Sequence, residues 1–392
     1  MRFMAQTKGR GQIIEKGKDK WLVRIFRGRD ANGKKMYFNK VIEGKKSIAQ
    51  KYLTGKLREK DLGIFVENSR QTLSEHLDFW LTTVKTRLAR QTYESYEMLL
   101  RLHIKPRIGQ LRLSEVKIHD VQIIYSELES DGLSSRTIRY VHTVLSMAMK
   151  KAVQLNIIIK NPCDYAELPK LMKDETKAFS PQQASLFLQH AQNNKHSLIF
   201  EIALVTGMRP EEYLGLRWSD VNLEKGIISI QKALVWHRKG GGWNLEEPKT
   251  KKSRRRIPLP KSLTDKLKRH RKKQLTYRFE LGSSYQNNDF VFASQIGTPL
   301  NSRNLSQRHF EKILEDAKLD NMGFVLYSLR HTCATLLLLS EENPKVVSDR
   351  LGHSSVKMTL DTYSHVLPGM QESASEKLEV MLFRKSGTPR KI

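Results

Sequence analysis

The fold is decided by the stretch HSLIFEIALVTGMRPEEYLGLRWSDV, residues 196–221. An apolar helix over residues 196–205 is predicted to stop near Gly207, because glycine tolerates the left-handed conformation that commonly ends a helix. Pro210 is predicted to begin the next helix, since its φ angle is preset for a first helical turn. Arg209 therefore lies in the short connection between two helices.

Three further basic side chains, well separated in the chain, precede a tyrosine. Lys249 lies in a turn region before a predicted strand, Arg330 begins a helix, and His353 follows a glycine. Tyr363 comes ten residues after His353. A phenol is a poor nucleophile at its usual pKa near ~10, so a catalytic tyrosine needs positive charge close by. Each residue alone has an ordinary structural explanation, as a helix cap, a solvated lysine or a core tyrosine.

Together these motifs resemble the tyrosine recombinase (phage integrase) family, especially integrases of temperate phages and of conjugative transposons of Gram-positive bacteria. The run TGMRPEEYLGLRWSDV, residues 206–221, is similar to the family's first signature box. The runs LRHT, LGH and TY, at residues 329–332, 351–353 and 362–363, are similar to the second box. The order and separation of the boxes agree with the family, and so does the step from histidine to tyrosine.

The resemblance implies a site-specific DNA recombinase, an integrase that integrates or excises a mobile element through a 3′-phosphotyrosine intermediate. Tyr363 would attack the scissile phosphate, and Arg209 and Arg330 would bind its non-bridging oxygens. His353 would be a further phosphate donor. The covalent intermediate stores the bond energy, so the resemblance implies no cofactor. No Cys/His spacing resembles a metal site, and the reaction is expected to be metal-independent.

Two positions leave this site incompletely assigned. Lys249 would protonate the leaving 5′ oxygen, but Lys251 in the same basic run fits the motif as an alternative. The family commonly has a histidine three residues before its second arginine, where this chain has Tyr327. A tyrosine can donate a hydrogen bond to phosphate but accepts a proton poorly at neutral pH. His331 is expected to brace the fold, because it points about 100° away from Arg330 on a helix.

Charge and composition point to a polyanionic partner. The 392 residues include 69 Lys and Arg against 41 Asp and Glu, a net charge of +28. Double-stranded DNA carrying attachment sites is the expected partner, with a homotetramer assembled on it and an accessory excision or bending protein as a further possibility. No apolar run long enough to span a membrane appears, and a cytoplasmic, nucleoid-associated protein is expected. Cys163 and Cys333 are expected to be core thiols.

The predicted fold is multidomain. Residues 1–65 are predicted to form a basic arm-type DNA-binding domain, a small β-sheet plus helix, and they carry 18 Lys and Arg against 6 Asp and Glu. Two strands, residues 21–27 and 35–41, are joined by the turn residues 30–33, and a helix follows over residues 47–61. Residues 66–170 are predicted to be an all-α core-binding domain whose longest helix is capped by Ser134 or Ser135. Residues 171–392 are predicted to be a mainly α (α+β) catalytic domain with a small antiparallel sheet and a C-terminal tail.

Two other functions share this fold and stay open at this point. One is a catalytically silent DNA-binding regulator, and the other is a type IB-like topoisomerase. The four motif residues argue against the regulator, and the separate basic N-terminal domain favours a recombinase over a topoisomerase. An amphipathic segment over residues 374–382 is expected to pack either on a neighbouring protomer or on its own domain.

Overall fold

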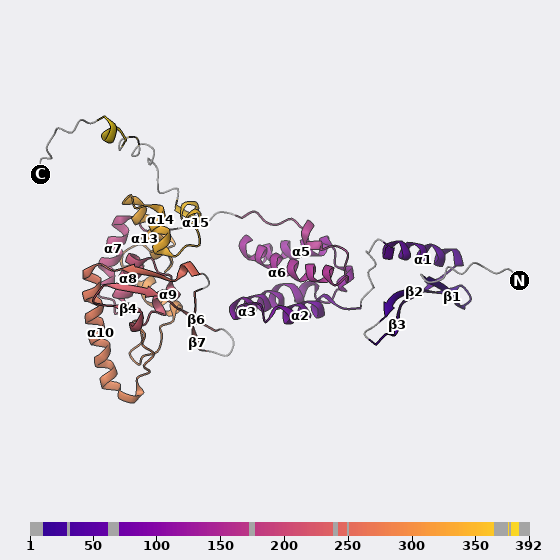
Figure 1. The fold of residues 1–392 in the computed structure, drawn as a ribbon, viewed down its shortest axis with the longest axis horizontal. Coiled ribbons are helices and arrows are strands. Elements are labelled where there is room, and N and C mark those ends of the chain that lie inside the picture. The colour runs from indigo at the N-terminus through magenta and orange to yellow at the C-terminus, as the bar shows by residue number, and fades with distance from the viewer. Residues whose placement is uncertain are drawn as a thin grey trace. The chain divides into compact units, whose positions relative to one another are not determined.

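The computed structural model describes residues 11–29, 32–61, 70–171, 177–237, 242–248, 251–363, 375 and 378–383. The chain divides into two compact units, residues 1–173 and residues 174–392. Figure 1 labels the helices and strands of both units. Within the described ranges, no helix has the length and apolar character needed to cross a membrane.

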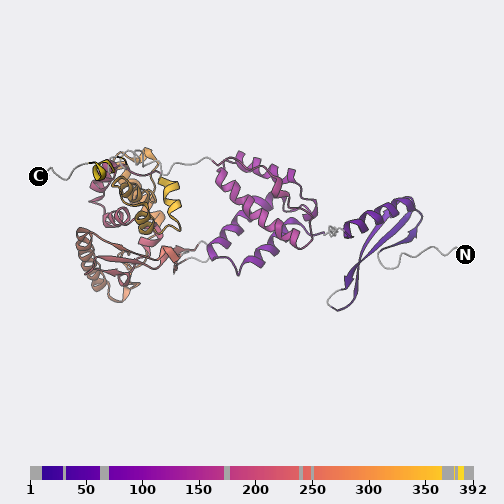
Figure 2. The same ribbon diagram turned by 45° about the horizontal axis from the view of Figure 1, so that its top comes forward.

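The first unit begins with a three-stranded antiparallel sheet that has a helix on one face (Figure 2). Its elements are β1 (Gly11–Gly17), β2 (Lys20–Arg29), β3 (Lys35–Glu43) and α1 (Lys46–Asp61). Val23 and Ile25 of β2 are fully buried in one apolar cluster with Ala49 and Leu53 of α1. The predicted hairpin and helix are confirmed, except that two residues of the predicted turn, 30 and 31, lie outside the described residues. Strand β1 was not predicted.

The rest of the first unit is helical. Its helices are α2 (Leu73–Val84), α3 (Arg90–Leu99), α4 (Lys105–Ile108), α5 (Ile118–Ser130) and α6 (Ser135–Gln154). Ser134 caps α6, since its hydroxyl accepts a hydrogen bond from the Thr137 amide at 3.3 Å. Residues from all five helices form a single apolar cluster, and Cys163 is buried in it. The chain therefore uses Ser134, and not Ser135, to begin its longest helix in this unit.

The second unit is mainly helical and contains two small antiparallel sheets. Its helices are α7 (Pro181–Ala191), α8 (Ser197–Thr206), α9 (Pro210–Leu214), α10 (Lys261–Leu281), α11 (Ser302–Leu305), α12 (Glu311–Asp316), α13 (Ser328–Leu339), α14 (Pro344–Leu351) and α15 (Val356–Tyr363). One sheet has the order β4 (Val221–Asn222), β5 (Ile227–Ile230), β8 (Arg255–Pro258), and a hairpin joins β6 (Ala233–Trp236) to β7 (Trp243–Glu246). The coarse fold class is confirmed, and the β6–β7 hairpin is an additional element.

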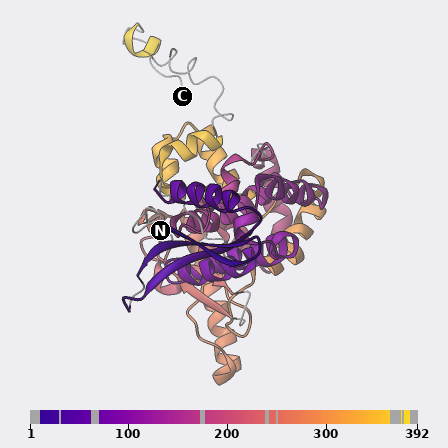
Figure 3. The same cartoon turned by 90° about the vertical axis from the view of Figure 1, so that its right-hand side faces the viewer.

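Helix α8 forms the centre of the second unit. It packs against α7, α10 and α13, and Phe200, Ile202 and Ala203 are fully buried. A helix that is apolar on all sides is stable only in such a core. Helix α10 extends beyond the rest of the unit (Figure 3). Because α8 is fixed by packing on several sides, the residues that follow its C-terminus have a defined position.

The end of the chain is described only in part. Residues 364–373, and residue 374 of the predicted amphipathic segment, lie outside the described residues. Leu378, Val380, Met381 and Leu382 are all exposed, with 49% to 79% of each residue accessible. Whether this segment packs on a neighbouring protomer or on its own domain therefore stays a prediction.

Candidate active site

The connection between α8 and α9 places Arg209 at the edge of the core. Gly207 ends α8 with φ +64°, and a Cβ there would lie 2.5 Å from Cδ2 of Leu351. Only glycine satisfies both the left-handed backbone and this close approach. Arg209 is the N-cap of α9 and Pro210 its first residue, as the sequence predicts. The guanidinium of Arg209 is thus brought beside α14, far away in the sequence.

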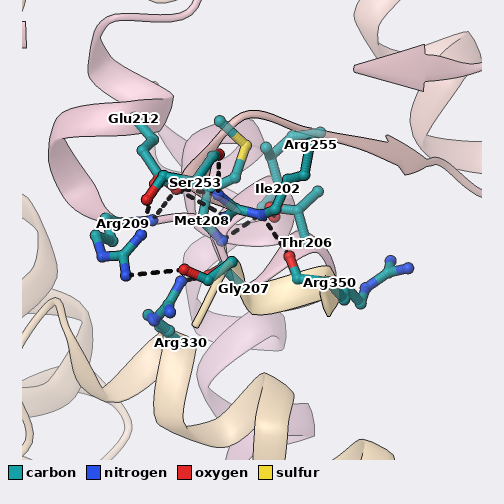
Figure 4. Close-up of polar contacts among 11 residues, drawn as sticks. Ile202, Thr206, Gly207, Met208, Arg209, Glu212, Ser253, Arg255, Arg330 and Arg350 are labelled. Atoms are coloured by element: carbon teal, nitrogen blue, oxygen red, sulfur yellow. Dashed lines mark hydrogen bonds and ion pairs between the residues drawn. The ribbon is translucent and has the colours of Figure 1, made fainter. Parts of the chain in front are cut away.

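Glu212 holds two arginines with one buried carboxylate (Figure 4). It accepts hydrogen bonds from the Arg209 amide at 2.9 Å and from Arg209 Nη1 at 2.8 Å. It also accepts from Arg255 Nη2 at 2.8 Å and Nη1 at 3.1 Å. Burial alone would raise the pKa of Glu212, but the bonds from Arg255 and Arg209 outweigh it and lower that pKa. The carboxylate is therefore ionised and fixes the positions of both arginines.

Arg255 connects this cluster to the loop that carries His353. Arg255 Nε donates to the Arg350 carbonyl at 2.5 Å, and Nη1 donates to the Ser253 carbonyl at 3.0 Å. A Cβ on Gly352 would lie 2.8 Å from Arg255 Nη1, and Gly352 has φ +68°. Arg209 Nη2 reaches the Gly352 carbonyl at 3.5 Å. Strand β8 thereby positions the histidine loop against the first arginine.

Arg330 is buried without a counter-ion in direct contact. Only 1% of the residue is exposed, and Nη1 donates to the Gly207 carbonyl at 2.7 Å (Figure 4). Its other terminal nitrogen, Nη2, is buried and has no hydrogen-bond partner among the described residues. Burial, and then the charge of Arg209, lower the pKa of Arg330 to about 10. A buried cation with a free donor is costly unless an anion completes it, so this position is suited to a phosphate oxygen.

His353 lies in the same cationic environment. Its ring is buried, and Nδ1 lies 2.8 Å from the Thr359 hydroxyl oxygen. Burial, followed by the charges of Arg330, Arg209 and Arg255, lowers the pKa of His353 to about 3. The imidazole is therefore neutral at physiological pH. A neutral ring can still donate one hydrogen bond to a phosphate oxygen.

Tyr327 stands at the N-terminus of α13, beside both arginines. It is 37% exposed, and the Arg330 guanidinium carbon lies 6.0 Å from its ring centroid. Burial alone would lower the pKa of Arg209. Glu212 and then Tyr327 outweigh this effect, so the pKa of Arg209 is raised above its ordinary value. Tyr327 therefore lies next to Arg209 and Arg330, the two arginines that are predicted to bind phosphate.

Tyr363, the last residue of α15, is 2% exposed. Its ring belongs to an apolar cluster formed with Ala334 and Leu338 of α13 and Val347 and Leu351 of α14. Burial raises the pKa of the phenol, while the charge of Arg330 lowers it. Arg330 therefore lies close enough to Tyr363 for its charge to act on the phenol.

His331, which is expected to brace the fold, makes a contact that the sequence did not predict. His331 Nδ1 lies 2.7 Å from the Tyr363 hydroxyl oxygen. Helix α15 packs on α14, and its Tyr363 lies in one apolar cluster with Ala334 and Leu338 of α13. His331 therefore contacts the predicted nucleophile directly.

The chain matches known proteins over nearly its whole length. Residues 177–369 match the phage integrase family, and residues 72–128 match the phage integrase N-terminal SAM-like domain. A XerC-like tyrosine recombinase of Caldanaerobacter subterraneus subsp. tengcongensis is 30% identical over 387 residues, which cover 93% of this chain and 97% of that protein. The chain belongs to the phage integrase family of tyrosine recombinases. It is a site-specific DNA recombinase, a member of an enzyme class that transfers DNA strands without a metal ion.

Integrases of mobile elements are among the relatives of this recombinase. The transposase of transposon Tn916 from Enterococcus faecalis is 26% identical over 322 residues, 78% of each chain. The Tn1549 transposon integrase, solved with a circular intermediate DNA, has a TM-score of 0.66 at 23% identity over 79% of this chain and 99% of that one. A lambda integrase dimer bound to a core site has a TM-score of 0.54 at 16% identity over 97% of both chains. These structures share the fold of the recombinase.

The two candidate lysines are not decided by the geometry. Lys249 lies outside the described residues, and so does the side chain of Lys251, whose backbone begins a short 3-10 turn that ends at Ser253. Lys252 Nζ, in the same turn, donates to the Ser354 carbonyl at 2.8 Å. The basic turn before β8 therefore runs next to the His353 loop.

Three residues of the site were not predicted: Glu212, Arg255 and His331. Glu212 had a detectable signal, because a Glu three residues after an N-cap commonly bonds back to the cap amide. Arg255 and His331 had none, since their partners are distant in sequence. In the described part of the chain, no group of three or more His, Cys, Asp or Glu side chains could hold a metal ion.

Proposed function

We propose that Tyr363 is the nucleophile of this recombinase and that Arg209, Arg330, His353 and Tyr327 bind the scissile phosphate. The observation that carries the proposal is the buried Arg330, whose Nη2 has no partner among the described residues. Arg209 and His353 lie beside it, held by the Glu212 and Arg255 network. A phosphate group would supply the negative charge that these side chains lack.

The chemistry follows from the positions of the groups. The Tyr363 oxygen attacks phosphorus, a 3′-phosphotyrosine forms, and the bond to the 5′ oxygen breaks. The arginines stabilise the negative charge that grows on the non-bridging oxygens of the transition state. Lys249, or Lys251 in its place, gives a proton to the departing 5′ oxygen. Tyr327 and His353 add hydrogen bonds to the same phosphate.

The chain is organised for this reaction as three domains. Residues 1–65 bind arm-type DNA sites, residues 66–170 bind the core site, and residues 171–392 carry out catalysis. The net charge of +28 supports binding to DNA, and the excess of 18 Lys and Arg over 6 Asp and Glu in residues 1–65 supports it for the first domain in particular. Solved relatives include a lambda integrase tetramer bound to a Holliday junction, which supports a homotetramer on DNA. The exposed apolar side chains of Leu378 and of residues 380–383 offer a surface for a neighbouring protomer.

The biological setting follows from the substrate. The recombinase integrates or excises a mobile element at attachment sites and acts in the cytoplasm as a nucleoid-associated protein. An accessory excision or bending protein is a further possible partner. The related transposase of transposon Tn916 supports a mobile element as its source. The presence of all four motif residues, Arg209, Arg330, His353 and Tyr363, argues against a catalytically silent regulator.

The test is covalent trapping on a nicked duplex that carries the joined ends of the element. Wild-type protein should form an adduct that survives denaturing electrophoresis. Tyr363→Phe should bind the same DNA with little loss and form none, because only the nucleophilic oxygen is removed. An adduct that persists in Tyr363→Phe would assign the nucleophile to another residue.

A further inference from the structure

The Tyr363 hydroxyl has one hydrogen-bond partner in the described site, and that partner is a histidine. His331 Nδ1 lies 2.7 Å from the hydroxyl oxygen, and the two ring centroids are 5.7 Å apart. The His331 ring is partly buried, and its centroid lies 5.1 Å from that of the Tyr327 ring. These contacts hold the imidazole in one orientation relative to the phenol.

In the hydrogen bond between Tyr363 and His331, the donor and the acceptor can be assigned. Burial and the neighbouring charge of Arg330 lower the pKa of His331 to about 4, so the ring is neutral at physiological pH. A neutral imidazole has one nitrogen that accepts and one that donates. A phenol is a far stronger acid than an imidazole N–H, so the hydroxyl donates and Nδ1 accepts. The Tyr363 hydroxyl therefore donates its hydrogen bond to a neutral imidazole.

The geometry points to His331 as the residue that removes the Tyr363 proton during strand cleavage. This inference rests on the proposed function of Tyr363. As the Tyr363 oxygen bonds to phosphorus, its proton moves to His331 Nδ1. The bond from phosphorus to the 5′ oxygen breaks, and that oxygen takes a proton from the lysine. Rejoining reverses each transfer, so both proton carriers return to their starting states.

Arg330 complements this role from the neighbouring position on α13. Its charge lowers the pKa of the Tyr363 phenol, against the effect of burial. Arg330 and His331 are adjacent in sequence, so one helix brings a cation to the phosphate and a base to the nucleophile. A hydrogen bond of 2.7 Å is within the reach that a general base requires.

The experiment compares His331→Asn with His331→Leu in the full-length protein. Asparagine can place an acceptor near the position of Nδ1 but cannot take up a proton, and leucine offers neither. The rate of adduct formation is measured in a single turnover on the nicked duplex with joined element ends. Both variants should cleave slower than wild type by about 10²–10⁴-fold, the contribution typical of a general base. DNA affinity and thermal melting, measured in parallel, identify any variant that fails to fold.

Three results would overturn the inference. If His331→Asn cleaves as fast as wild type and only His331→Leu is slow, the histidine only orients the phenol. If both variants cleave faster, His331 is a latch that restrains Tyr363 in the resting protein. If neither rate changes, the contact has no part in cleavage. Because asparagine is smaller than histidine and polar, it is the variant that decides the matter if leucine unfolds the site.

A second substrate separates the two proton transfers. In a duplex with sulfur in place of the bridging 5′ oxygen, the leaving thiolate needs no proton, so the lysine is bypassed. His331→Asn should cleave this duplex as slowly as the unmodified one. A return to the wild-type rate would instead mean that His331 delivers the proton to the leaving oxygen. Tyr363→Phe should form no adduct on either substrate. An adduct with Tyr363→Phe would refute the proposed nucleophile, whereas a fast His331→Asn would refute only the role of the base.

Discussion

The change Glu212→Gln should destabilise the second unit far more than an ordinary ion-pair mutation. The Glu212 and Arg255 side chains are only 4% and 6% exposed, and the carboxylate accepts from both arginines of its network. Glutamine would turn an amide donor toward these guanidiniums and leave a buried cation without its counter-ion. Removing one partner of such a pair costs about 3–5 kcal/mol. For a domain of this size, that corresponds to a fall in melting temperature of roughly 6–20 °C.

Differential scanning calorimetry of the full-length protein measures this fall. The matched control is Glu247→Gln, because Glu247 also pairs with an arginine, Arg254, but their side chains are 72% and 53% exposed. An exposed pair contributes about 0–1 kcal/mol, so the control should melt within a few degrees of wild type. If Glu212→Gln melts together with the control, the buried carboxylate does not organise the site.

The loss of stability in Glu212→Gln should also depend on pH, and it should become smaller as the pH falls. The folded protein holds the pKa of Glu212 below its ordinary value. A depressed carboxyl pKa stabilises the folded state above the unfolded pKa, and that stabilisation is lost as pH falls through the folded pKa. The difference in stability between wild type and Glu212→Gln should therefore be full at neutral pH and shrink in strongly acidic buffer. A difference that grows on acidification would contradict this assignment.

Three further predictions follow from the site and the charge distribution. If Tyr327 donates to the phosphate, Tyr327→His should be tolerated in single-turnover cleavage and Tyr327→Phe should lose about 1–3 kcal/mol of transition-state stabilisation; the opposite order would mean that Tyr327 only packs. Deleting residues 1–65 should spare cleavage of a core site but flatten the dependence of log affinity on log salt, since fewer counterions are released; an unchanged slope would exclude the domain from DNA binding. EDTA should leave strand cleavage by the wild-type protein intact, and a strict magnesium requirement would contradict direct attack by tyrosine.

Much of the fold was accessible from sequence because the signals were local. Alternating strands, Gly207 before Pro210 and the serine cap of α6 all act within a few residues. Strand β1 was missed because its short run depends on pairing with β2, with Ile14 opposite Leu22. The hairpin β6–β7 was missed for the same reason, since its strands are held by each other.

The residues of the candidate site also divide into those that local sequence patterns predict and those that they do not. Motif spacing predicted Arg209, Arg330, His353 and Tyr363, and the structure brings the first three around one buried position. The contact between His331 and Tyr363 was missed because the two residues are 32 positions apart, so only the tertiary structure brings them together. The Glu212 and Arg255 network spans 43 residues, and no local pattern indicates that these side chains meet.

The central claim is that one tyrosine forms the covalent bond to DNA. The most direct measurement is mass spectrometry of proteolytic peptides from wild-type adduct trapped on the nicked duplex. The account predicts a nucleotide attached by a 3′-phosphate to the phenolic oxygen in the peptide that contains Tyr363. A nucleotide on any other residue, or one linked through a 5′-phosphate, would contradict it.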